Sequence, residues 1–220
     1  MIQLVAFLGN PGDEYACNRH NAGWMLARAL PFYASLRWQK KFKGLYASIN
    51  SAEIAQFSEP RQDQSAQGPS FEKIHFLLPE TYMNHSGESV HGAASFFKVK
   101  IEEILVVHDE LELPLGTISL KFSGGLGGHN GLRSMKACCG AADFWRLRIG
   151  IGRPDSRLPG EGGPEGSGRG VIDWVLSDFS GAERELLDPA LDAGAGLLLR
   201  ALAGEPEALL PQWAKKKISG

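Results

Sequence analysis

Apolar runs of strand length alternate along this chain with segments of helical pattern. The run Ile104-Leu105-Val106-Val107 is apolar throughout, which is typical of a strand buried on both faces of a sheet. The alternation predicts an α/β fold with a central mixed β-sheet flanked by helices. Strands are expected near residues 2–9, 73–78, 104–108, 116–122 and 144–152, a hairpin near 45–57, and helices near 21–34, 85–97, 131–139 and 182–203.

The length and composition predict one domain over residues 1–220. A chain of 220 residues with 43% hydrophobic residues can bury the core of a single domain. Two polar segments, 58–70 and 153–170, are expected to be mobile loops, and residues 214–220 a basic tail. No apolar run approaches the ~20 residues that span a membrane, and the start lacks the pattern of a secretory signal. We therefore expect a cytoplasmic protein with no membrane partner.

Charge is balanced over the whole chain but not along it. With 23 basic and 25 acidic residues the formal charge is −2, so no overall basic field marks the protein as a nucleic-acid binder. Arg146 and Arg148 alternate along an expected strand and should therefore share one face. Such a local cluster suits contacts with phosphate, and a solvated surface is the alternative.

Polar side chains follow four of the expected strands. In open α/β sheets, ligands bind beyond the carboxyl ends of the strands. If these ends share one edge, a single crevice would contain an imidazole, a carboxylate and three primary amides. The residues in question are Asn10 and His20, then Tyr82, Met83 and Asn84, then Asp109, and finally His129 and Asn130.

This set of side chains suits hydrolysis by an activated water. Histidine moves a proton near neutral pH, and a carboxylate on its other nitrogen holds the tautomer of a general base. Carboxamides do not titrate here, but they position water, carbonyl oxygens or peptide groups. The chain has no GxSxG elbow, which argues against a covalent serine intermediate. The histidines lack metal-ligand spacing and SGGLGGHNG lacks the Lys-Ser/Thr of a P-loop, so neither a metal nor a cofactor is expected.

Each residue also has an ordinary structural explanation when it is taken alone. Asn10 precedes Pro11-Gly12 and suits a turn, Asn84 suits a helix N-cap, and Asp109 suits the turn after a strand. The functional hypothesis depends on their combination.

Four segments together resemble the bacterial-type peptidyl-tRNA hydrolase family, in the same order and at similar intervals. They are GNPGDEYACNRHNAG, PETYMNHSGESV, VVHDELELPLGTISLKFSGGLGGHNGLRS and FWRLRIGIGRP. The resemblance covers residues 2–153 and, more loosely, the C-terminal helix. It implies cleavage of the ester between a peptidyl group and the 3′-terminal ribose of tRNA, by a monomer without a cofactor that binds the acceptor arm and 3′ end of its substrate.

The resemblance also implies roles for individual residues. His20 matches the histidine that deprotonates the attacking water, Asp109 the supporting carboxylate, and Asn10 the residue that separates blocked from unblocked esters. Lys121 and Arg148 match residues that clamp tRNA phosphate. Positions associated with the 3′ end, the peptide and the water are Tyr15, Tyr82, Met83, Asn84 and Asn130, and His129 is grouped with these substrate-binding residues.

Two other functions stay open at this point. A non-catalytic RNA-binding relative could retain the fold and a basic face, although all the expected catalytic side chains are present here. A general esterase that uses His20 and Asp109 without tRNA would leave Lys121 and Arg148 without a role.

Overall fold

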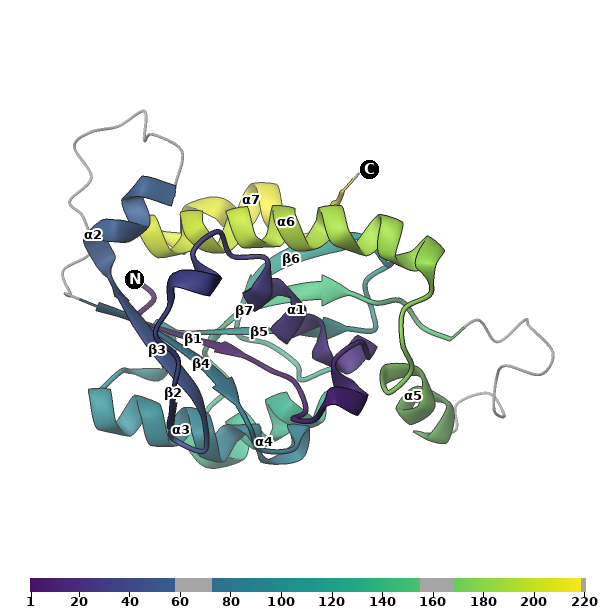
Figure 1. Ribbon diagram of the computed structural model, residues 1–220, viewed down its shortest axis with the longest axis horizontal. Coiled ribbons are helices and arrows are strands. Elements are labelled where there is room, and N and C mark those ends of the chain that lie inside the picture. The colour runs from purple at the N-terminus through teal and green to yellow at the C-terminus, as the bar shows by residue number, and fades with distance from the viewer. Residues whose placement is uncertain (58–72, 155–167, 219–220) are drawn as a thin grey trace.

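The computed structural model describes residues 1–57, 73–154 and 168–218. Its centre is an eight-stranded mixed sheet with the order β2-β3-β4-β1-β5-β7-β6-β8, in which β4, β1, β5 and β7 are parallel and the other pairs are antiparallel (Figure 1). The predicted α/β class and mixed sheet are confirmed. The strands are β1 (Leu4–Phe7), β2 (Gln39–Lys41), β3 (Gly44–Asn50), β4 (Lys73–Pro79), β5 (Ile104–Glu110), β6 (Thr117–Phe122), β7 (Trp145–Gly150) and β8 (Lys216–Lys217).

Helices cover both faces of the sheet (Figure 1). Val5 and Phe7 of β1 belong to the core beneath α1 and α6, whereas Leu4 and Ala6 belong to the core beneath α3 and α4. Burial on both faces explains why the central strands are continuously apolar. The α-helices are α1 (Ala22–Arg28), α2 (Ser51–Ile54), α3 (Ser86–Phe97), α4 (Asn130–Cys139), α5 (Gly168–Val175), α6 (Gly181–Ala203) and α7 (Leu210–Trp213).

Short 3₁₀ helices connect several of these elements. They are η1 (Asp13–Tyr15), η2 (Arg19–Asn21), η3 (Tyr33–Ser35), η4 (Ala55–Phe57), η5 (Met83–His85), η6 (Ile101–Glu103) and η7 (Pro206–Leu209). Two of them, η2 and η5, directly precede α1 and α3 and carry residues of the predicted site.

Two predicted boundaries were wrong. The helix expected at 21–34 ends at Arg28, because Pro31 cannot continue a regular helix. The hairpin expected at 45–57 spans residues 39–50 instead, and residues 51–57 are helical. In its turn, Phe42 and Lys43 each have a φ of 55°. This left-handed conformation is usual for glycine or asparagine, so the two residue types gave no sign of a turn here.

The expected loops and tail are described only in part. Loop 58–70 lies outside the described residues, as do residues 155–167 of the second loop, and its last three residues belong instead to α5. In the described part of the tail, Lys216 and Lys217 pair with β6 as strand β8. Among the described helices, none combines the length and apolarity needed to cross a membrane.

The carboxyl ends of β1, β4 and β5 meet at one edge of the sheet, because β1 lies between the other two and runs parallel to both. At this edge the first turn of α1 approaches the backbone closely. A Cβ atom at Gly23 would lie 2.5 Å from the carbonyl oxygen of Leu8 and 2.7 Å from that of Val107. Only glycine permits this approach, which brings the residues before α1 to the strand ends.

Candidate active site

His20 and Asp109 form a buried pair at the edge of the sheet. His20 comes from η2, and Asp109 is the penultimate residue of β5, inside the strand and not past its end as predicted. His20 Nδ1 lies 2.9 Å from Asp109 Oδ1, and the two residues are 8% and 2% exposed. Because a carboxylate can only accept, Nδ1 carries the hydrogen and Nε2 keeps a lone pair. The pair therefore has the tautomer that a general base requires.

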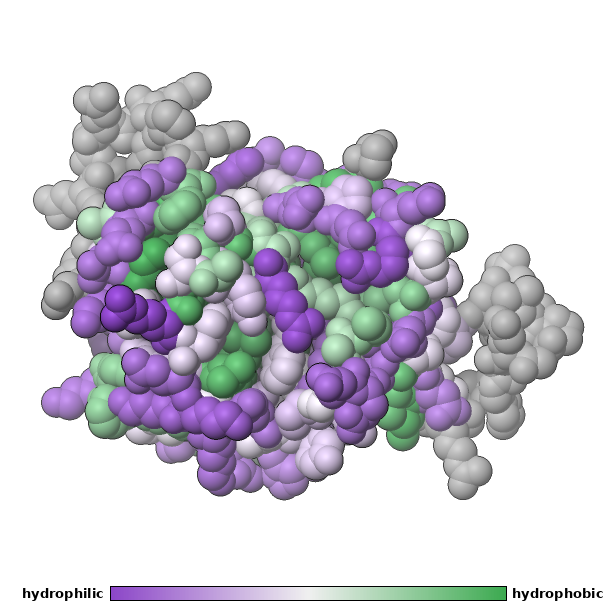
Figure 2. Space-filling view, viewed as in Figure 1, coloured by the Kyte–Doolittle hydropathy of each residue, from purple (hydrophilic) through white to green (hydrophobic). Residues whose placement is uncertain are grey.

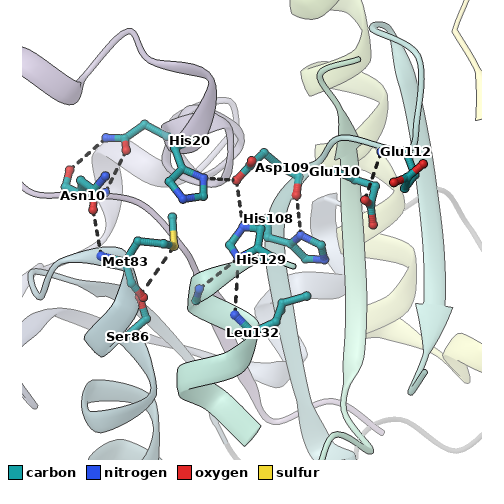
Figure 3. Close-up of polar contacts among 12 residues, drawn as sticks. Asn10, His20, Met83, Ser86, His108, Asp109, Glu110, Glu112, His129 and Leu132 are labelled. Carbon is teal, nitrogen blue, oxygen red and sulfur yellow. Dashed lines mark hydrogen bonds and ion pairs between the residues drawn. The ribbon is translucent and has the colours of Figure 1, made fainter. Parts of the chain in front are cut away.

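A second imidazole donates to the same carboxylate oxygen (Figure 3). His129 Nε2 lies 3.0 Å from Asp109 Oδ1, while its Nδ1 accepts from the backbone N–H groups of Gly131 at 3.1 Å and Leu132 at 3.4 Å. These amide donors require an unprotonated Nδ1, so the hydrogen is on Nε2. His129 is thus both the N-cap of α4 and a partner of Asp109, a double role that its position in the sequence did not indicate.

The pKa values follow from burial and these contacts. Burial raises the pKa of the Asp109 carboxyl, but the imidazoles of His20 and His129 outweigh it and hold that pKa well below its usual range. Burial lowers the pKa of His20, but the charge and hydrogen bond of Asp109 outweigh it, so the pKa lies above its ordinary value. Asp109 is therefore ionised, and its charge favours an imidazolium at His20 once a proton has been taken.

A third buried imidazole, His108, was missed as part of this cluster. Its Nδ1 donates to the carbonyl oxygen of Asp109 at 2.6 Å, and its ring centroid lies 4.9 Å from that of His129. Burial lowers the pKa of His108 well below its ordinary value, so this ring is neutral. No signal in the sequence distinguished it from the other histidines, because its role comes from the end of β5 lying against α4.

Amide groups lie on the other side of His20 (Figure 3). The Oδ1 atom of Asn10 accepts from the backbone N–H of Met83 at 2.8 Å. Asn21 pairs with the backbone of Asn10, accepting from its N–H at 2.8 Å and donating to its carbonyl at 3.0 Å. The bond from Met83 uses one lone pair of Oδ1 and fixes the orientation of the Asn10 amide, whose Nδ2 can donate. Asn21 was missed as a site residue, although it stands in the RHNAG motif.

Of the other predicted substrate-binding residues, Tyr82 and Asn84 flank Met83 in the chain, and Tyr15 meets Tyr82. Met83 is buried, and its carbonyl accepts from Ser86 Oγ at 2.9 Å, which fixes η5 on α3. The rings of Tyr15 and Tyr82 meet edge to face, with centroids 6.5 Å apart. Tyr82 is 59% exposed and Asn84 is also exposed on η5. These side chains form an accessible polar and aromatic surface next to Asn10.

A cavity of about 370 Å³ lies beside the pair of His20 and Asp109. One side of it is formed by His20, Asp109 and the loop that carries His129 and Asn130, and the other side is formed by α5. This second side was not predicted, because no helix was expected over residues 168–175, of which only the first three belonged to the expected loop. The apolar residues that α5 contributes are Val171, Ile172 and Val175.

The predicted basic residues lie on one face of β6 and β7. Lys121 is opposite Arg146 and Ser119 is opposite Arg148, so the predicted alternation of the two arginines is confirmed. Lys121 is half-buried, whereas Arg148 donates to Ser119 Oγ at 2.7 Å and lies 3.6 Å from a carboxylate oxygen of Glu110.

Arg146, in contrast, is buried and does not belong to a solvated surface. It is 2% exposed and donates to the carbonyl oxygens of Gly124 at 2.8 Å and Gly125 at 2.5 Å. It therefore holds the glycine-rich loop that leads to His129.

The acidic and imidazole groups could in principle bind a cation. Among the described residues, the candidate ligand atoms of His20, Asp109 and His129 lie within 4.8 Å of one another. However, a metal bound at His129 Nε2 would need the lone pair that the helix-capping tautomer replaces with a hydrogen. The contacts fit a hydrogen-bonded cluster, and the expected absence of a metal stays a prediction.

Comparison with known proteins identifies the family. The sequence matches the family Peptidyl-tRNA hydrolase over residues 4–219. It is 43% identical over 220 residues to the Peptidyl-tRNA hydrolase of Treponema pallidum (strain Nichols), covering 99% of this chain and 96% of that one. The crystal structure of peptidyl-tRNA hydrolase from Acinetobacter baumannii superposes with a TM-score of 0.74 at 34% identity, covering 96% of this chain and 91% of that chain. A peptidyl-tRNA hydrolase in complex with N-propanol gives a TM-score of 0.73 at the same identity and coverage. The chain belongs to the peptidyl-tRNA hydrolase family, and its activity is that of a carboxylic ester hydrolase acting on peptidyl-tRNA.

Proposed function

We propose that His20 deprotonates the water that attacks the peptidyl-tRNA ester, with Asp109 stabilising the resulting imidazolium. The observation that carries this proposal is the hydrogen bond between His20 Nδ1 and Asp109 Oδ1, which leaves Nε2 as the proton acceptor. The proton then passes from His20 to the ribose oxygen as the tetrahedral intermediate collapses. An ester is an activated acyl group, and a general base of this kind contributes about 10²- to 10⁴-fold.

The amide of Asn10 is proposed to select blocked esters. Its Oδ1 is occupied by the N–H of Met83, so it offers hydrogen-bond donors to the substrate. The carbonyl of a peptide bond accepts such a donor, whereas the free ammonium of an aminoacyl ester has only donors to offer. A site that presents donors at this point therefore favours peptidyl over aminoacyl groups.

The two sides of His20 are proposed to hold the two halves of the substrate. The cavity between His129 and α5 would take the 3′-terminal ribose and its base, because it lies directly beside His20 and Asp109. The peptide would lie over Asn10 and Met83, with Tyr15, Tyr82 and Asn84 around it. We assign the amide of Asn130, which lines the cavity, to the water or the ester oxygen, and the contacts along the peptide to Tyr15, Tyr82 and Asn84.

Lys121 and Arg148 are proposed to contact phosphates of the acceptor arm. They share one face of β6 and β7, next to the glycine-rich loop that carries His129. Because Arg148 lies close to Glu110, Lys121 would make the more direct contact. Phosphate contacts position the tRNA without reading its sequence, so a local patch suffices in a chain of net charge −2. From the resemblance to the family we also propose that the protein acts as a monomer, in the cytoplasm where its substrate arises.

The test is the release of a labelled N-acetyl-aminoacyl group from tRNA by the purified protein. We expect cleavage of the blocked ester, little cleavage of the unblocked one, and a loss of about 10²- to 10⁴-fold in His20→Ala. His91→Ala is the matched control, because His91 is exposed on α3 and away from the site.

Two results would contradict the proposal. If the wild type binds tRNA but leaves the blocked ester intact, the non-catalytic RNA-binding function is correct. If short peptidyl esters without tRNA are cleaved equally well, the protein is a general esterase.

A further inference from the structure

The residue next to His20, Arg19, makes contacts that the catalytic chemistry does not use. It is only 4% exposed, yet its partners lie about 155 to 164 positions further along the chain. Its Nη1 donates to the carbonyl of Ser177 at 3.1 Å, the hydroxyl of Ser177 at 2.7 Å and the carbonyl of Asp178 at 2.7 Å. Its Nη2 lies 2.6 and 2.8 Å from the two carboxylate oxygens of Glu183. One guanidinium thus binds both the connection between α5 and α6 and the first turn of α6.

Aromatic rings enclose the same guanidinium. Its Cζ lies 3.7 Å from the ring centroid of Trp174 and 5.0 Å from that of Phe179. Trp174 belongs to α5, and its indole N–H donates to the carbonyl of Gly152 at 2.9 Å. A planar guanidinium can stack on a ring and pair with a carboxylate at the same time, which the ammonium of lysine cannot do.

Helix α5, which these contacts hold, buries few apolar side chains. Among the side chains of α5 that the structure describes, only Val175 is buried, while Ile172 is 53% exposed. Figure 2 shows apolar residues on the surface at the position of α5. Because a helix that buries so little apolar area is not held by the hydrophobic effect alone, its position depends on the contacts of Arg19 and Trp174.

Arg19 and the catalytic base stand on the same short turn. The backbone N–H of Arg19 also donates to the carbonyl of Ser177 at 3.0 Å, and Asn18 forms a β-bridge with Asp178. Since His20 lines one side of the cavity and α5 lines the other, η2 connects the two sides through a few bonds.

We propose that Arg19 is a positioning residue that sets the α5 side of the cavity at the correct distance from His20. The substrate group in the cavity would then be placed for attack by the water on His20. This inference rests on the proposed function, in which the cavity takes the 3′-terminal ribose and its base. It adds a residue that acts through α5 and does not touch the ester.

The charge of Glu183 supports the same arrangement. Burial raises the pKa of this carboxyl, but hydrogen bonds from the Ser180 N–H and from Arg19 outweigh it, so the pKa lies below its ordinary value. Glu183 also completes the capping box of α6 with Ser180. The ion pair therefore joins η2 to a fixed helix end.

The experiment compares Arg19→Lys with the matched control Arg184→Lys. Arg184 lies one residue after Glu183 and pairs with Asp188, without a described contact to α5. For Arg19→Lys we expect faster hydrogen exchange of the amides of residues 168–175, and a KM for N-acetyl-aminoacyl-tRNA raised about tenfold. We expect kcat to stay within about twofold and its pH profile to be unchanged, because the pair of His20 and Asp109 remains in place. Arg184→Lys should change none of these quantities.

A second variant separates the charge from the stacking. Glu183→Gln keeps an N3 side chain that can cap α6 but removes the charge facing Arg19. We expect the same changes at smaller size. The double variant should show less than the sum of the two effects in log KM, because both residues act through one contact.

Three results would overturn the inference. If Arg19→Lys only lowers the unfolding midpoint, with KM, kcat and exchange at α5 unchanged, Arg19 has a structural role alone. If kcat falls and its pH profile shifts while KM is constant, Arg19 acts on His20 and not through α5. If exchange at α5 rises but KM is unchanged, the cavity does not bind the substrate, even though the wild type cleaves the ester.

Discussion

The two sides of His20 are built from different chemistry. Toward Asp109, a single buried charge is shared by two imidazoles, which donate to the same oxygen at 2.9 and 3.0 Å. Toward Asn10, the contacts join neutral amide groups of side chains and backbone, and these contacts fix the orientation of the Asn10 amide. The first arrangement stabilises a change of charge on His20, and the second holds hydrogen-bond donors in fixed directions.

This difference separates two requirements of the reaction. Proton transfer needs a nearby charge, whose effect is large in a buried site. Discrimination between a peptide and an ammonium needs oriented dipoles, because it depends on which partner can accept a hydrogen bond. If the two sides are independent, variants on one side should change the rate and variants on the other should change the selectivity.

The largest effect is expected from Asp109→Asn. The substitution keeps the shape and an acceptor for both imidazoles but removes the charge that stabilises the imidazolium of His20. We expect kcat for N-acetyl-aminoacyl-tRNA to fall about 10²- to 10⁴-fold, with little change in the preference for blocked esters. Asp143→Asn is the control, since Asp143 is exposed and pairs with Ser123. A large loss of preference would show that the two sides are not independent.

A smaller effect on the rate, but a larger one on selectivity, is expected from Asn10→Asp. The new carboxylate can still accept from the N–H of Met83 but offers a charge in place of donors. We expect the ratio of blocked to unblocked cleavage to fall by about 10- to 100-fold, because an ammonium is then favoured and a peptide carbonyl is not. The measurement is kcat/KM for the two esters side by side, with the exposed Asn50→Asp as control. An unchanged ratio would exclude Asn10 as the selecting amide.

The smallest effect on the rate is expected from His129→Asn, which should mainly change how kcat/KM depends on pH. An asparagine can still cap α4, but it is too short to donate to Asp109. Without that donor the charge of Asp109 acts more strongly on His20, so the pKa of His20 should rise further above its ordinary value. Since His20 must be unprotonated to act as a base, the acid limb of kcat/KM should move to higher pH, with a smaller change on the plateau. A limb that stays in place would mean that His129 does not influence Asp109.

The fold was largely predictable because its signals are local. The apolar runs of β1, β4, β5 and β7 and the helical pattern of α3, α4 and α6 can be read within short windows. The errors lie where local patterns are weak or conflict. The turn at Phe42 and Lys43 has no glycine or asparagine, and α5 begins within a glycine-rich stretch, so the hairpin was placed wrongly and no helix was predicted at α5.

The site was predictable to the extent that its residues follow strand ends. That reasoning placed these side chains in one crevice, and the structure brings His20 to Asp109 and Asn10 to Met83 within hydrogen-bonding distance. It did not find Asn21, His108 or Arg19, whose partners are set by how the elements pack and not by the positions of strand ends.

The sequence by itself therefore determined the α/β class, the edge of the sheet that carries the site, and the family to which the chain belongs. Only the tertiary structure decided which nitrogen of each imidazole carries a hydrogen, which atom of Asn10 is occupied, and what forms the far side of the cavity. The physical reason is that secondary structure depends on neighbours in sequence, whereas hydrogen-bond roles depend on groups that meet after folding. Arg19 shows this most clearly, because its sequence neighbour is the proposed catalytic base and its side-chain partners begin 155 positions later, at Trp174.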